Sequence, residues 1–314
     1  SVQADGTLQG SSVQVAANQG SARGAGRDGL ANSVRVQRRG RIAGSNVTVA
    51  GNRGSAQQGS VNSVDVAGTL QGGSITILGN QGSANGGVAN SVIADGSIRG
   101  SSITILGNQA TAQGGSSKVN SVTGSGSIKG SQVLIAANTG RASGGGLVNG
   151  LHNTGSVSGA QVVITGNHGT ATGGGTVNSV DNRGQLSGRV LIAGNRGSAT
   201  MGGTVNSLVN HGVMAGNVVI AGNRGQAVAG GVSNSVINQG VITGLVTIAG
   251  NNTAAGPGMT SGSVRNLGGA ITGAAGVAGN TPFAANAGYT YTLPSTGVVN
   301  QSVTVLPAFN ILNM

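Results

Sequence analysis

The sequence has 314 residues, of which 63 are glycine, 1% are aromatic and none is cysteine or tryptophan. This composition is unlike that of a globular core, and because glycine does not recur at every third position and only 4 residues are proline, a collagen triple helix is excluded. The net charge of +11, from 16 Lys and Arg against 5 Asp and Glu, favours contact with polyanions.

Neither a membrane span nor a disulfide framework is expected. No run approaches 18 consecutive apolar residues, and without cysteine the fold has to be stabilised by packing alone. The sequence starts at Ser1 without a leading apolar segment, as a processed secreted protein would. We therefore expect an extracellular or cell-surface location.

A repeat of about 28 residues organises the chain from Ser1 to about Gly262. Its landmark is an Asn that follows two small residues, and neighbouring landmarks are 28 to 34 residues apart. The landmarks are Asn18, Asn52, Asn80, Asn108, Asn138, Asn167, Asn195, Asn223, Asn251 and Asn280. So regular a period is typical of a solenoid, in which each repeat buries its apolar face only when a neighbour stacks on it. The in-register hydrophobic residues argue against disorder.

Each repeat is expected to contain β-strand rather than helix, because interior glycine costs a helix about 1 kcal/mol per site. Five and three residues before the landmark, nine consecutive repeats carry Val or Ile at both positions, as in Ile75 and Ile77. This period of two predicts a strand with one buried face. Three further columns, represented by Val64, Leu70 and Ala84, complete a narrow core.

Two columns of polar or small residues are assigned to the corners of the coil. Glycines such as Gly68 and Gly96 are expected to adopt positive φ there. The landmark Asn is expected either to occupy a turn or to form an amide ladder along the stack, rather than to contact a ligand. This structural column comprises Asn52, Asn80, Asn108, Asn138, Asn167, Asn195 and Asn223.

The sequence therefore predicts an all-β fold, a single β-solenoid (parallel β-helix) of about ten coils of 28 to 34 residues. The repeat array covers residues 1–280, and residues 281–314 form a C-terminal capping or assembly segment. Ten coils stacked at about 4.7–4.9 Å would rise about 45–50 Å. Whether one repeat forms one coil or a hairpin stays open at this point.

The densest basic run lies early in the array and is the candidate polyanion-binding site. It contains Arg35, Arg38, Arg39 and Arg41. Anionic polysaccharide or extracellular DNA would be suitable partners. No aromatic residue lies nearby to stack on bases, so sequence-specific nucleic-acid recognition is not expected.

An apolar stripe is predicted on the outer face of the middle repeats. The outward residue between the paired β-branched positions is Thr in early repeats, as at Thr76, and becomes apolar later. The later residues are Leu134, Val163, Leu191 and Val219. If stacked, they would pack against the tail or another subunit.

From about Leu151 the repeats read N-x-G-x-(L/V/M)-x-G, as in Asn153–Gly159, Asn182–Gly188 and Asn210–Gly216. This pattern resembles the repeats of filamentous haemagglutinins and autotransporter passengers. The resemblance implies a right-handed parallel β-helix that projects from Gram-negative cells in an adhesive or structural role. The array is also similar, more distantly, to curli-type subunits.

The composition changes abruptly after Asn280. Residues 281–314 contain all the aromatic residues of the chain and three of its four prolines. They either cap their own last coil or pair with another subunit, and the second arrangement would give a head-to-tail filament. The candidate assembly residues are Phe283, Tyr289, Tyr291, Leu293, Val303, Val305, Phe309 and Ile311.

Catalysis is not expected, because the chemistry of polysaccharide-cleaving β-helices needs clustered carboxylates. The acidic residues are scattered among the repeats: Asp5, Asp28, Asp65, Asp95 and Asp181. His152, His168 and His211 lie in different columns, so neither a metal site nor a cofactor is expected.

The leading hypothesis is an extracellular structural protein that self-assembles head to tail into a filament or biofilm-matrix fibre through its C-terminal segment. The alternative is a cell-surface, adhesin-type module that binds anionic polymers through its Arg-rich face.

Overall fold

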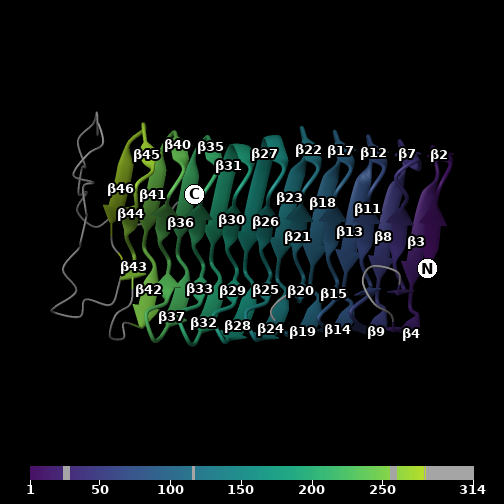
Figure 1. The fold of residues 1–314 in the computed structure, drawn as a ribbon, viewed down its shortest axis with the longest axis horizontal. Helices are drawn as coiled ribbons and strands as arrows, with labels where there is room; N and C mark the ends of the chain where they lie inside the picture. Colours follow the sequence, from purple (N-terminus) through teal and green to yellow (C-terminus); the bar gives the residue numbers. More distant parts are fainter. Residues whose placement is uncertain (24–28, 115–116, 255–259, 279, 281–314) are drawn as a thin grey trace.

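The computed structural model describes residues 1–23, 29–114, 117–254, 260–278 and 280. These residues form 46 β-strands and no helix. The strands stack in parallel along one axis, from the purple N-terminal coil to the yellow-green C-terminal one (Figure 1). Each repeat forms one coil, so the prediction of a β-solenoid is confirmed and the hairpin alternative is excluded.

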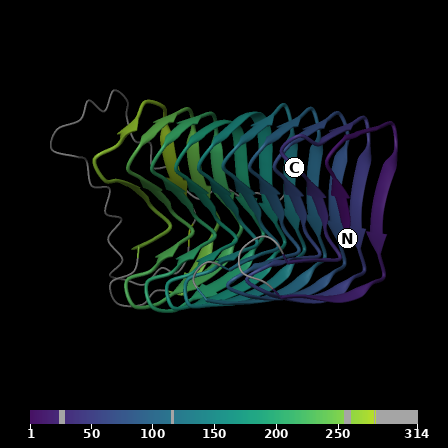
Figure 2. The same ribbon diagram turned by 45° about the vertical axis from the view of Figure 1, so that its right-hand side comes forward.

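Four parallel sheets, here named A to D, run along the solenoid. A coil contributes one strand to sheet A, usually two to sheet B, then one each to sheets C and D. Nine coils in the described part of the chain pass through all four sheets, and a tenth adds three strands. Seen obliquely, the coil follows a bent path rather than a circle (Figure 2).

Sheet A has ten strands of three residues. They are β1 (Val2–Ala4), β6 (Val34–Val36), β11 (Val64–Val66), β16 (Val92–Ala94), β21 (Val122–Gly124), β26 (Leu151–Asn153), β30 (Val180–Asn182), β34 (Leu208–Asn210), β39 (Val236–Asn238) and β44 (Val264–Asn266).

Sheet B has eighteen strands, and two of them are long because two coils lack the usual break. They are β2 (Thr7–Gln9), β3 (Ser12–Ala16), β7 (Arg41–Ala43), β8 (Asn46–Ala50), β12 (Thr69–Gln71), β13 (Ser74–Leu78), β17 (Ser97–Arg99), β18 (Ser102–Leu106), β22 (Ser127–Lys129), β23 (Gln132–Ala136), β27 (Ser156–Thr165), β31 (Gln185–Ala193), β35 (Val213–Ala215), β36 (Val218–Ala221), β40 (Val241–Thr243), β41 (Val246–Ala249), β45 (Ala270–Ile271) and β46 (Ala275–Ala278).

Sheets C and D have nine strands each. Sheet C contains β4 (Gln19–Arg23), β9 (Arg53–Gln57), β14 (Gln81–Asn85), β19 (Gln109–Gln113), β24 (Thr139–Ser143), β28 (His168–Thr172), β32 (Arg196–Ala199), β37 (Arg224–Ala227) and β42 (Asn252–Ala254). Sheet D contains β5 (Leu30–Ala31), β10 (Ser60–Val61), β15 (Val88–Ala89), β20 (Lys118–Val119), β25 (Leu147–Val148), β29 (Thr176–Val177), β33 (Thr204–Val205), β38 (Val232–Ser233) and β43 (Thr260–Ser261).

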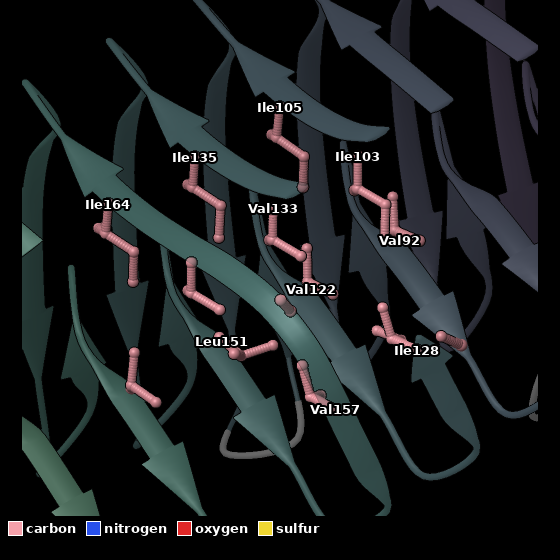
Figure 3. Packing of buried hydrophobic residues seen from close by; sticks show 14 of the residues in the cluster. Val92, Ile103, Ile105, Val122, Ile128, Val133, Ile135, Leu151, Val157 and Ile164 are labelled. Carbon is pink, nitrogen blue, oxygen red and sulfur yellow. The ribbon is translucent and has the colours of Figure 1, made fainter. Parts of the chain in front are cut away.

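The predicted apolar columns form the core. Like residues pair in register from coil to coil, as Ile75 with Ile103 and Ile77 with Ile105, and these side chains are fully buried. The larger cluster packs between sheets A and B, where Val122 and the isoleucines of neighbouring coils interdigitate (Figure 3). A second cluster, of small Ala and Val side chains, lies between sheets C and D.

The glycines between sheets A and B correct one expectation from the sequence. Gly68 and Gly96 are not among the residues with positive φ. They are required instead because backbones of successive coils nearly touch: a Cβ on Gly96 would lie 2.0 Å from the carbonyl oxygen of Gly68. The left-handed conformation occurs at other columns, such as those of Asn62 (φ 50°), Gly72 (φ 60°) and Gly79 (φ 62°).

Candidate assembly and anion-binding surfaces

The landmark Asn residues form a continuous amide ladder at the corner between sheets B and C. In its middle, Asn108 Nδ2 donates to Asn138 Oδ1 (3.0 Å) and to the carbonyl oxygen of Ile77 (2.9 Å). Asn108 Oδ1 accepts from Asn80 Nδ2 (3.0 Å) and from the Asn80 backbone N–H (2.9 Å). Of the two roles considered from the sequence, the ladder is the one observed. The amide is buried with all these groups satisfied, and the column links coils rather than binding a ligand.

A second ladder follows the Asn of the Asn-Ser steps, at the corner between sheets D and A. Asn62 Nδ2 donates to Asn90 Oδ1 and to the carbonyl oxygen of Gln81, both at 3.0 Å. The ladder comprises Asn32, Asn62, Asn90, Asn120, Asn149, Asn178, Asn206 and Asn234. Asn tolerates the left-handed backbone that this corner imposes, which explains its use there.

A third ladder exists only in the C-terminal half and lies inside the core. It joins Asn153, Asn182, Asn210, Asn238 and Asn266 at 2.7–2.8 Å. It starts at Asn153 because the preceding coil has Gly124 in register, and Asn153 Oδ1 is buried without a hydrogen-bond partner. The N-x-G pattern marked these residues, but their inward direction could not be read from the spacing.

The first coil exposes an edge that every later coil has covered. Asn18 is exposed, whereas the landmarks from Asn52 onward are buried, and Val2 is 37% exposed where its counterparts in the next coils are fully buried. No described residue donates to Asn18 Oδ1, whereas Asn18 Nδ2 donates to Asn52 Oδ1 at 3.2 Å. Among the described residues, no strand pairs with this edge, and an edge of this kind can accept a further strand or coil.

The predicted apolar stripe is a real column on sheet B. Leu134 pairs in register with Val163, Val163 with Leu191, and Leu191 with Val219. All four side chains are half-buried. The stripe ends at Val219, which pairs with Thr247 in the next coil, and the exposed Val213 and Leu245 lie in other columns.

The Arg run of the second coil does not form one exposed face. Arg35 is buried, and its Nε donates to Asp65 Oδ2 of the next coil at 3.2 Å. Arg38 and Arg39 are exposed, and Arg41 Nη2 donates to Gln71 Oε1 at 3.0 Å. Arg35 is therefore buried in an ion pair within the solenoid, where it cannot contact a polymer at the surface.

One polar cluster lies on sheet A and the turns that follow its strands, in the sixth to eighth coils. His152 Nδ1 lies 2.9 Å from Asp181 Oδ2, and Arg183 Nε lies 3.3 Å from the same atom. Burial acts to raise the pKa of Asp181, but the hydrogen bond and charge of His152, with Arg183 and His211, outweigh it and hold the pKa of this carboxyl below its ordinary value of 3.8.

The candidate assembly residues of the C-terminal segment, Phe283 to Ile311, lie outside the described residues. Within the described ranges, no group of three or more His, Asp or Glu side chains is arranged to hold a metal ion. Nor does that part of the chain contain an apolar helix long enough to span a bilayer. No family model, curated protein or solved structure matches this chain.

Proposed function

We propose that this protein is a structural subunit that assembles end to end into an extracellular filament or matrix fibre. In this proposal the C-terminal end of one copy contacts the open N-terminal edge of the next. The observation that carries it is the first coil, which has the backbone and side-chain pattern of an internal coil but is uncovered on one side. The extracellular setting rests on the resemblance of the repeats to those of haemagglutinins and autotransporter passengers.

The polarity of the landmark ladder favours a head-to-tail contact. Each amide nitrogen donates to the carboxamide oxygen one coil nearer the C-terminus. The N-terminal end therefore offers an acceptor, Asn18 Oδ1. At the other end Asn280 Oδ1 accepts from Asn251, and Asn280 Nδ2 donates one N–H to the carbonyl oxygen of Ile248 and carries a second N–H. Unlike ends that fit each other generate a heterologous contact, which propagates into a filament unless it closes into a ring.

Gly6 supports the same contact. The equivalent glycines Gly40, Gly68 and Gly96 leave no room for a Cβ, which would lie 2.0–2.2 Å from a carbonyl oxygen of the preceding coil. Gly6 has nothing within 4 Å in the single chain and does not have positive φ. A larger residue at Gly6 would thus be tolerated by the monomer but would obstruct a coil stacked on this edge.

The test compares wild type with Gly6→Val by sedimentation velocity and negative-stain electron microscopy. We expect wild type to form filaments and Gly6→Val to remain a folded monomer with an unchanged circular dichroism spectrum. Gln14→Val is the matched control, because Gln14 lies in the same coil but is exposed on the outer face. The proposal is wrong if wild type stays monodisperse at every concentration, or if Gly6→Val assembles as wild type does.

A chain ending at Asn280 tests the contribution of the C-terminal segment. If residues 281–314 supply the contact, the truncated protein stays folded and monomeric. Filaments of unchanged length and number from the truncated protein would instead show that coil-to-coil stacking is sufficient.

A further inference from the structure

Charge is segregated around the described solenoid. The described acidic residues all lie on sheet A or on the turn that follows it: Asp5, Asp65, Asp95 and Asp181. The outer face of sheet C carries no carboxylate among its described residues but has five arginines and one histidine. They are Arg23, Arg53, Arg141, His168, Arg196 and Arg224. Far apart in sequence, these residues converge because each repeat returns to the same sheet.

Three of these side chains stack directly on one another. His168 pairs in register with Arg196, and Arg196 with Arg224, so the side chains lie one strand spacing apart, about 4.8 Å. Their strands alternate between outward polar residues and inward Gly or Ala, which directs the charged groups to solvent. Arg141 adds a fourth group in the neighbouring row, in register with Thr170.

No described carboxylate neutralises these arginines. No ion pair joins Arg141, Arg196 or Arg224 to a described carboxylate, and all three side chains are exposed. Like charges stacked in register repel, so an external anion is favoured there. The backbone at Arg196 and Arg224 is held in place, because their carbonyl oxygens accept hydrogen bonds at 2.9 Å from the buried side-chain amides of Asn178 and Asn206.

The neighbouring groups indicate the class of anion. Thr139, Thr170, Ser198 and Gln226 lie on the same face and offer hydroxyl and amide groups. The chain has no aromatic residue before residue 281, so the described face has no platform on which nucleic-acid bases could stack. Arg matches carboxylates with paired hydrogen bonds. These features suit a sugar polymer that carries carboxylates and hydroxyls.

We propose that the outer face of sheet C, centred on Arg141, Arg196 and Arg224, binds a linear carboxylated polysaccharide laid along the solenoid axis. A polymer in this direction meets Arg141, Arg196 and Arg224, with His168 between the first two. This inference does not depend on end-to-end assembly, since a single chain presents the whole face. It places anion binding on sheet C rather than on the Arg35 to Arg41 run.

The test measures binding of the full chain to polygalacturonate at low and physiological ionic strength, with neutral dextran as the blank. R141Q/R196Q/R224Q should weaken binding roughly 3- to 100-fold at low salt and flatten the salt dependence. R38Q/R39Q/R41Q removes the same charge from sheet B and its preceding turn, and should change binding less than about twofold. Unchanged circular dichroism will establish that both variants are folded.

Three results would overturn the proposal. Equal losses in the two triple variants would mean that net charge alone drives binding. Unchanged binding in R141Q/R196Q/R224Q would exclude the sheet C face. Tighter binding to single-stranded oligothymidylate than to polygalacturonate, lost in the same variant, would identify nucleic acid as the ligand.

Discussion

The amide ladder makes a quantitative prediction at Asn108, in the middle of the array. Asn108→Ala removes four hydrogen bonds of 2.9 to 3.0 Å. The buried backbone N–H of Asn80 and the carbonyl oxygen of Ile77 then lose their Asn108 partners. At about 1 kcal/mol for each bond, with a further penalty for buried groups left unpaired, the cost is about 4–6 kcal/mol. That is a large fraction of the stability of an ordinary domain.

Asn18→Ala is the matched control, because it changes the same residue of the same column at the open end. Asn18 is exposed and its side chain makes one described hydrogen bond, so we expect a loss below about 1 kcal/mol. Urea denaturation followed by circular dichroism gives both costs, and hydrogen exchange shows whether coils next to residue 108 open first, as nearest-neighbour coupling predicts. Equal costs for the two variants would refute the ladder as a source of stability.

Three further substitutions test other contacts. Gly96→Ala places a Cβ 2.0 Å from a carbonyl oxygen of the preceding coil, so we expect a loss of about 2–4 kcal/mol in urea denaturation. Arg35→Met leaves the buried carboxylate of Asp65 without this guanidinium and should cost about 3 kcal/mol at neutral pH. Asp181→Asn removes a carboxylate whose pKa is lowered beside His152, so its cost of about 1 kcal/mol should be present above about pH 4 and disappear as the pH falls through the folded-state pKa.

Each of these three predictions can be contradicted by a specific result. Gly6→Ala serves as the control for the glycine column, and a loss as large as that of Gly96→Ala would mean that close stacking is not the cause. A stable Arg35→Met variant would show that the ion pair is dispensable. A deficit of Asp181→Asn that persists unchanged at acid pH would exclude the carboxylate as its source.

The buried columns could be predicted from the sequence because periodicity carries direct information about packing. Val or Ile at a spacing of two, repeated every coil, specifies both a strand and the face that is buried, and Ile75 and Ile77 lie where this pattern predicts. The landmark Asn column could be recognised in the same way. Whether this column occupies a turn or forms a ladder depends on the distances between coils, which the sequence does not contain.

Other features depend on geometry that a repeat spacing does not contain. Whether a glycine is required for φ or for close approach depends on the neighbouring coil, so the sequence alone predicts the wrong role for Gly96. Arg35 belongs to a dense basic run, but its burial against Asp65 depends on the register of the next coil. Arg196 and Arg224 look isolated along the chain, and only stacking brings them together on sheet C.

The central claim, that coil stacking continues from one subunit to the next, is tested most directly by the axial repeat of wild-type assemblies in electron micrographs and their diffraction. Ten coils at about 4.7–4.9 Å predict a subunit repeat on the order of 50 Å together with a continuous meridional spacing near 4.8 Å. A repeat near twice that length would indicate paired, two-fold contacts instead. That result, or short rods that never join, would contradict head-to-tail stacking.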